Sequence, residues 1–133
     1  MSDETRDRVR HRAGYKCKYC QLSEHNSAFA FHIEHIVAKQ HGGSDDPSNL
    51  ALACHRCNLQ KGPNLTGIDP ETGQIATLFH PRTEPWWDHF RKDGIHIQGT
   101  TPTGRATVRL LQMNDERRLD LRQTIVSRGQ YLW

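Results

Sequence analysis

Two pairs of closely spaced cysteines constrain the fold of this chain more than any other feature. Cys17 and Cys20 form the first pair, Cys54 and Cys57 form the second, and both pairs have the C-x-x-C spacing. Two such knuckles supply four soft thiolates that can converge tetrahedrally on Zn²⁺. The 33 residues between the pairs are more than the simplest zinc ribbons contain, so we expect a further structural unit between the knuckles.

A metal staple suits a chain of this size and composition. The 133 residues can form one compact core, but only 35% of them are hydrophobic and the mean hydropathy is −0.81. Zinc binding would add the folding free energy that such a core lacks. Disulfide bonds are the alternative, but residues 1–6 lack the apolar segment of a secretion signal, and the cytosol keeps thiols reduced. We therefore expect structural zinc in a cytoplasmic protein without a membrane span.

The charge balance says little about partners, whereas the type of basic residue says more. The net charge is +3, yet thirteen of the 18 basic residues are arginines, whose guanidinium grips phosphate with a bidentate fork. Arg6, Arg8, Arg10 and Arg12 alternate near the start of the chain among acidic residues. We expect them to form a solvated helix face, with phosphate tracking as the alternative.

Periodicity and turn residues predict an α+β fold. The patterns favour a helix over 4–13, strands over 28–37 and 48–53, and a short helix over 54–61. Residues 1–65 would form the core. Residues 66–133 would pack on it as an extension and would not form an independent domain. The elements expected there are a hairpin over 68–75, a short helix over 86–90, a strand over 95–97, and helices over 101–113 and 115–127. The short helix would place Trp86 and Trp87 in the core. The last helix would present Leu119, Leu121, Ile125 and Val126 as its apolar positions.

Chemistry-bearing residues follow one another in a fixed order between and just after the knuckles. Glu34 and His35 are adjacent on a predicted strand end, so their side chains point apart and one can hold a metal while the other faces a substrate. A Glu34 carboxylate and an Asn58 amide would form an incomplete oxygen shell of the kind that suits Mg²⁺. His35 has the ordinary pKa of a base that works near neutral pH.

At these residues the sequence resembles the HNH endonuclease family, whose core is the ββα-metal motif. The resemblance covers 17–62 and is carried by the segments 32–37, 42–52 and 54–62. The first H of the family name falls on His35, the N on Asn49, and the last H on Asn58, a variant that also ligates metal through oxygen. The expected fold is a zinc-stapled ββα-metal core with a C-terminal hairpin and helical extension.

The resemblance also implies a role for each of these residues. His35 would activate the attacking water, while Glu34 and Asn58 would hold one Mg²⁺ or Mn²⁺ at the scissile phosphate. Asn49 would tie the two strands together and orient the loop of His35. Lys61 would contact phosphate or be a solvated lysine at the helix end.

Several alternatives remain open at this level. His41 and His80 are possible additional residues of the site, His41 more readily as an ordinary loop residue. The implied substrate is DNA, with RNA left open, and the products would carry 5′-phosphate and 3′-hydroxyl ends. Nothing in the sequence indicates the oligomeric state or a partner subunit. The competing hypothesis is a non-catalytic zinc-ribbon module that binds nucleic acid or protein, for which the set Glu34, His35 and Asn58 would be unnecessary.

Overall fold

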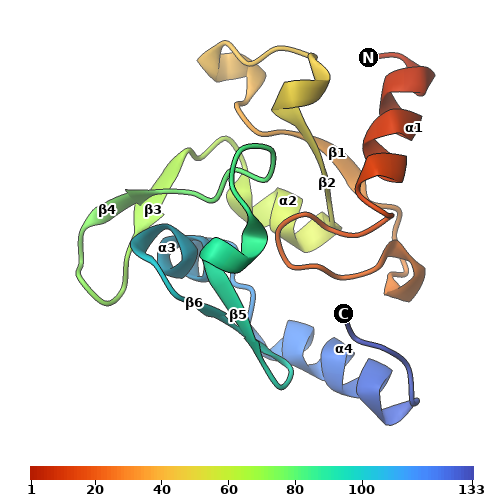
Figure 1. The fold of residues 1–133 in the computed structure, drawn as a ribbon, viewed down its shortest axis with the longest axis vertical. Helices are drawn as coiled ribbons and strands as arrows, with labels where there is room; N and C mark the ends of the chain where they lie inside the picture. Colours follow the sequence, from red (N-terminus) through yellow and green to blue (C-terminus); the bar gives the residue numbers. More distant parts are fainter.

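The computed structural model describes residues 1–133 and has the expected α+β architecture. It contains four α-helices and three separate two-stranded antiparallel sheets. Figure 1 shows α1 (Asp3–Arg12) beside the β1–β2 pair, with the two later hairpins and α3 on the other side of α2 and with α4 at the far end. The mixed helices, short strands and clustered cysteines confirm the fold class.

The central ββα unit lies between the two cysteine pairs and runs into the second. Strand β1 (His32–His35) pairs antiparallel with β2 (Leu50–Ala53), and α2 (His55–Lys61) begins two residues after β2 ends. The strand expected over 28–37 is therefore too long. The Ser27 hydroxyl bonds both the N–H and the carbonyl of Phe29, so this part of the chain turns instead of extending a sheet.

The loop between β1 and β2 folds tightly onto the end of β1. It contains two 3-10 turns, Lys39–His41 and Pro47–Asn49. Between them the backbone of Gly43 passes so close to Val37 that an added Cβ would lie 1.7 Å from the Val37 carbonyl oxygen. Only glycine fits there, and this close approach fixes the path of the loop.

The extension forms two hairpins and two helices. Its elements are β3 (Thr66–Ile68), β4 (Ile75–Thr77), β5 (Phe90–Asp93), β6 (His96–Gly99), α3 (Pro102–Leu110) and α4 (Glu116–Ser127). Thr101 caps α3 through its side chain, as Pro102 at the first helical position predicts.

Two expectations for the extension are wrong. The helix over 86–90 is only a 3-10 turn, Trp86–Asp88, because Phe90 opens β5 and pairs with Gly99. Trp86 is buried as expected, but Trp87 is 64% exposed. In α4, Leu121 and Val126 are exposed, whereas the buried residues are Arg118, Arg122 and Ile125.

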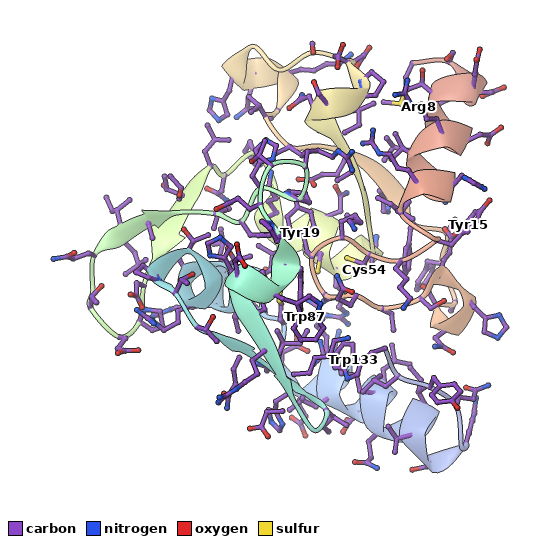
Figure 2. The ribbon with its side chains drawn as sticks, in the orientation of Figure 1. Arg8, Tyr15, Tyr19, Cys54, Trp87 and Trp133 are labelled. Carbon is purple, nitrogen blue, oxygen red and sulfur yellow. The ribbon has the colours of Figure 1, made fainter.

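One hydrophobic cluster of 16 buried residues includes side chains from both parts of the chain. Val9 of α1, Leu52 of β2 and Met113 after α3 all belong to it. The indole Nε1 of Trp86 donates to the Tyr19 carbonyl oxygen at 2.7 Å. Figure 2 shows Trp87 and Trp133 near each other above α4, and the Lys92 ammonium lies 4.9 Å and 4.7 Å from the centres of these two rings. The C-terminal residues thus pack back onto the extension.

Candidate functional site

The four cysteines converge as their spacing predicts. Their Sγ atoms all lie within 4.8 Å of one another, and none forms a disulfide. Each pair is held in a turn by a backbone N–H···S bond of 3.4 Å, from Cys20 to Cys17 and from Cys57 to Cys54. Burial raises the pKa of the Cys17 and Cys57 thiols, while hydrogen bonding with Cys17 lowers the pKa of Cys20 and Cys54. The group is the size and chemistry of a tetrahedral zinc site.

Two buried arginines of α4 lie against this cysteine cluster. Arg118 Nη2 is 3.0 Å from Cys57 Sγ and 3.8 Å from Cys54 Sγ, and Arg118 Nη1 donates to the Leu111 carbonyl oxygen. Burial alone would lower the pKa of Arg118, but the negative charge of the cysteines outweighs it and raises that pKa. Arg122 donates only to backbone and amide oxygens, and burial lowers its pKa despite the same cysteine charges.

Arg118 has no carboxylate partner among the ion pairs of the structure, so the cysteine sulfurs that it contacts are its counter-charge. A zinc ion held by four thiolates would carry two net negative charges, which Arg118 would offset at contact distance and Arg122 only through the longer-range effect of its charge. The second sphere of this site therefore comes from the extension, since Arg118 follows Cys57 by 61 positions in the sequence. In Figure 2, Cys54 lies near the centre of the molecule.

His35 lies at the end of β1 and is oriented by a carboxylate. Its Nε2 is 2.7 Å from Asp45 Oδ1 in the loop that follows. The hydrogen bond to His35 lowers the pKa of Asp45, which therefore stays ionised and can only accept a proton. The proton of a neutral His35 ring is thus on Nε2, and the lone pair is on Nδ1.

Asn49 bonds the loop to the strand that carries His35. Its Oδ1 accepts from the Val37 N–H at 2.9 Å, and its Nδ2 donates to the carbonyl oxygens of Val37 and Ser44 at 3.0 and 2.9 Å. Its own carbonyl oxygen accepts from the Ile36 N–H. These bonds use the whole amide, so Asn49 has no free group for a substrate.

Glu34 points the opposite way from His35, into the protein. Its side chain is buried, and Lys61 Nζ lies 2.7 Å from Oε1, but neither carboxylate oxygen has an aligned hydrogen bond. The Tyr19 hydroxyl lies beside this carboxylate and likewise has no aligned hydrogen bond. Burial raises the pKa of Glu34 against the opposing charge of Lys61, and burial with the Glu34 charge raises the pKa of Tyr19. A buried carboxylate with free lone pairs is costly unless a further ligand uses them.

Of the two alternatives for Lys61, a contact with phosphate or a solvated lysine at the helix end, its burial contradicts the second. It is only 2% exposed, and besides its contact with Glu34 it donates to the Ile36 carbonyl oxygen at 2.8 Å. Glu34 and the backbone of Ile36, just after β1, thus occupy the ammonium. Asn58 lies one turn earlier on α2 and hence on the same side of the helix. Its side-chain amide makes no hydrogen bond in the structure and is partly exposed.

His41 and His80, the possible additional residues of the site, form no hydrogen bond with Glu34, His35, Asn49, Asn58 or Lys61. His41 is exposed in the first 3-10 turn of the loop. His80 uses Nδ1 to accept the N–H groups of Arg82 and Thr83, which caps a turn after β4.

The sequence interpretation missed three residues of these sites. Asp45 is one of two adjacent aspartates, and nothing in the pattern distinguishes it from Asp46. Tyr19 lies between Cys17 and Cys20, and the C-x-x-C pattern specifies only the two cysteines. Arg118 did carry a signal, because Arg118, Arg122 and Ile125 recur at helical spacing on one face, but a search for apolar residues passes over arginines.

Comparison with known families identifies the central part of the chain. A family model described as HNH endonuclease matches residues 17–64. Searches among curated proteins and among solved structures found no match. None of the helices combines the length and the apolar character needed to cross a bilayer. The matched region contains the four clustered cysteines and the ββα unit, and it is similar in sequence to the HNH endonuclease family.

Proposed function

We propose that this protein is a metal-dependent endonuclease that hydrolyses phosphodiester bonds of DNA and leaves 5′-phosphate and 3′-hydroxyl ends. The family match supports a nuclease in general terms. The observation that carries the specific proposal is the pair of adjacent residues on β1, a surface histidine oriented by Asp45 and a buried carboxylate with unused lone pairs.

His35 acts as the general base. With its Nε2 proton directed at Asp45, the lone pair on Nδ1 is available to take a proton from the attacking water. Asp45 then stabilises the imidazolium that forms, as a carboxylate beside a catalytic histidine does. Asn49 keeps the loop that holds Asp45 bonded to the end of β1, so the two side chains stay in register.

Glu34 and Asn58 are the residues that would hold a divalent cation. The Glu34 carboxylate, whose Oε1 is paired with Lys61, and the unbonded amide of Asn58 supply oxygen donors of the kind that Mg²⁺ or Mn²⁺ takes. When bound, such an ion supplies positive charge at the scissile phosphate and the leaving 3′ oxygen. Lys61 is a positioning residue here, because its ammonium fixes the Glu34 carboxylate from the interior.

Digestion of a supercoiled plasmid by the zinc-loaded full chain tests the proposal. We expect nicked or linear product with Mg²⁺ or Mn²⁺, and none from reactions without added divalent cation or from His35→Ala. His96→Ala changes an exposed histidine of β6 and is the matched control that should cut normally. Zinc content and circular dichroism are recorded for every protein, since chelators also strip the cysteine cluster.

Intact plasmid with every divalent ion, from protein that retains its zinc and its fold, would contradict the proposal. That result would favour the non-catalytic zinc-ribbon module. Cleavage by His35→Ala at the wild-type rate would leave a nuclease but remove the assigned base.

A further inference from the structure

Five basic residues form a group without any carboxylate partner. None of Arg8, Arg12, Lys16, Lys18 and Arg82 takes part in any of the ion pairs of the structure. They come from three separate segments, namely α1, the first cysteine knuckle and the turn after β4. Figure 2 labels Arg8 on α1. We call this group the basic band.

Arg8 and Arg12 line one hollow over α1, and the charges of the other members of the band act on Arg12 and Lys18. Burial, then the charges of Arg82 and Arg8, lower the pKa of Arg12. Burial, then the charge of Arg82 with smaller effects of Arg12 and Lys16, lower the pKa of Lys18. Like charges brought together in a folded protein cost stability, and that cost is relieved when an anion binds across them.

The two acidic residues nearby, Asp7 and Asp46, offset only part of the charge of the five basic residues. Asp46 feels the charge of Arg8, but its carboxylate is occupied by the N–H and hydroxyl of Ser48. Asp7 shares a shallow open hollow over α1 with Arg8 and Arg12, yet it forms no ion pair. The band therefore keeps a net positive charge at the surface.

The basic band meets the edge of β2 through the Arg12 side chain and the Lys18 backbone, on the strand that pairs with the strand of His35. The Arg12 guanidinium donates to the carbonyl oxygens of Pro47 and Leu50, and Leu50 is the residue directly opposite His35 in the β1–β2 pair. The Lys18 N–H donates to the Leu52 carbonyl oxygen on the same strand at 2.8 Å. Neighbouring strands are about 4.8 Å apart, so the band begins roughly 10 Å from the catalytic histidine. A duplex rises about 3.4 Å per nucleotide along each strand, which places the band a few phosphates from the cleavage point.

We propose that the basic band binds the phosphate backbone of duplex DNA and holds the strand with its scissile phosphate at His35. This inference rests on the proposed nuclease function and names the surface that receives its substrate. Contacts of this kind position a duplex without reading its bases, so the band confers affinity and register but no sequence preference. Arg12 is the fixed member, since backbone carbonyls already hold its guanidinium. Arg8, Lys18 and Arg82 are the members free to meet phosphate.

Binding of a labelled 30-base-pair duplex, followed by fluorescence anisotropy, tests the band. All proteins carry His35→Ala, retain zinc and are measured without added divalent cation, so binding is recorded without cleavage. We expect Arg8→Gln/Arg82→Gln to raise Kd at least 10-fold at low salt, and Lys18→Gln to raise it further. The slope of log K against log salt should fall by about 0.9 for each phosphate that the variant no longer neutralises. The matched control is Arg109→Gln/Arg128→Gln, which removes two exposed arginines outside the band.

Equal Kd and equal salt slope for the band variant and the control would overturn the inference. So would a complete lack of duplex binding by the parent protein. Plasmid cleavage by the chain with His35 intact is measured in parallel, which separates the two ideas. Cleavage with an unaffected Kd removes only the band, whereas a band-dependent Kd without cleavage removes only the nuclease.

Discussion

The cysteine cluster and the Glu34–His35 site lie on the same ββα unit, but they differ in how far their polar groups are hydrogen-bonded. At the cluster, backbone N–H groups and the Arg118 guanidinium bond the sulfurs. At Glu34, two carboxylate oxygens and the Tyr19 hydroxyl are buried without aligned hydrogen bonds.

This difference is the one expected between a metal site that stabilises the fold and a site with ligand positions open to a substrate. A closed set of four ligands leaves no position for a substrate, which is typical of structural zinc. An incomplete shell with free lone pairs costs stability, and functional sites are where such costs occur. Single substitutions at either site test this difference, and the largest effect is expected at the zinc ligands.

Replacing one zinc ligand should abolish the fold. Structural zinc contributes about 10–16 kcal/mol in small domains, which is as much as the whole stability of a typical protein. We expect Cys54→Ser to lose both zinc and the circular dichroism of the folded chain. His55→Ala, which changes a residue between the ligands, should retain both. A folded and active Cys54→Ser protein would show that the cluster is not the staple.

Removing the cation that holds Glu34 should be the next largest change. Lys61→Met leaves a buried carboxylate without its counter-charge, at a cost of about 3–5 kcal/mol in the free energy of unfolding. Lys39→Met is the control, because its ammonium is 67% exposed and surface pairs contribute little. Denaturant unfolding of both variants measures the difference.

A double variant checks the cause of this loss. If Glu34 is what Lys61 compensates, Glu34→Gln/Lys61→Met should recover much of the stability that Lys61→Met alone loses. The absence of any recovery would mean that the bond from Lys61 to Ile36, and not the ion pair, holds α2 against β1.

Asp45→Asn should affect the reaction while leaving the fold unchanged. The amide no longer requires the Nε2 proton of His35 or stabilises its imidazolium, so we expect kcat to fall about 100-fold with an unchanged melting temperature. Asp46→Asn makes the same change one residue away and keeps a side-chain oxygen for Ser48. An equal fall in kcat for both variants would argue against a specific role of Asp45.

Arg118→Met should weaken the zinc site by a smaller factor. Loss of a group that bonds a metal ligand typically lowers metal affinity by about 10–100-fold. Competition with a chromogenic chelator measures that affinity directly. Arg117→Met is the matched control, since Arg117 is its exposed neighbour on α4. Zinc affinity equal to the control would show that the guanidinium only fills space beside the cysteines.

Much of the fold could be predicted because its strongest determinants are local. The cysteine spacing, Thr101 with Pro102, and the order strand, loop, strand, helix all act over a few residues, and the structure has them. Element ends were less accurate. The limits of β1 and the turn at Trp86 depend on which residues a hairpin pairs, and that is decided by contacts distant in sequence.

The environment of the candidate site could not be predicted for the same reason. Burial of Lys61 beside Glu34 requires α2 to lie against β1, and the Arg118–Cys57 contact joins residues 61 apart. A one-dimensional pattern treats Lys61 as a helix-end cation and Arg118 as a surface residue, because isolated basic side chains usually are. Only the three-dimensional packing turns them into counter-charges.

The contact of Arg118 with the cysteines also has a consequence for the order of events during synthesis. The four cysteines are complete once residue 57 has left the ribosome, but the Arg118 guanidinium that contacts them is encoded 61 residues later. A nascent chain that had captured zinc would therefore carry an uncompensated negative charge at its metal centre until α4 had been made and had packed against the cysteines.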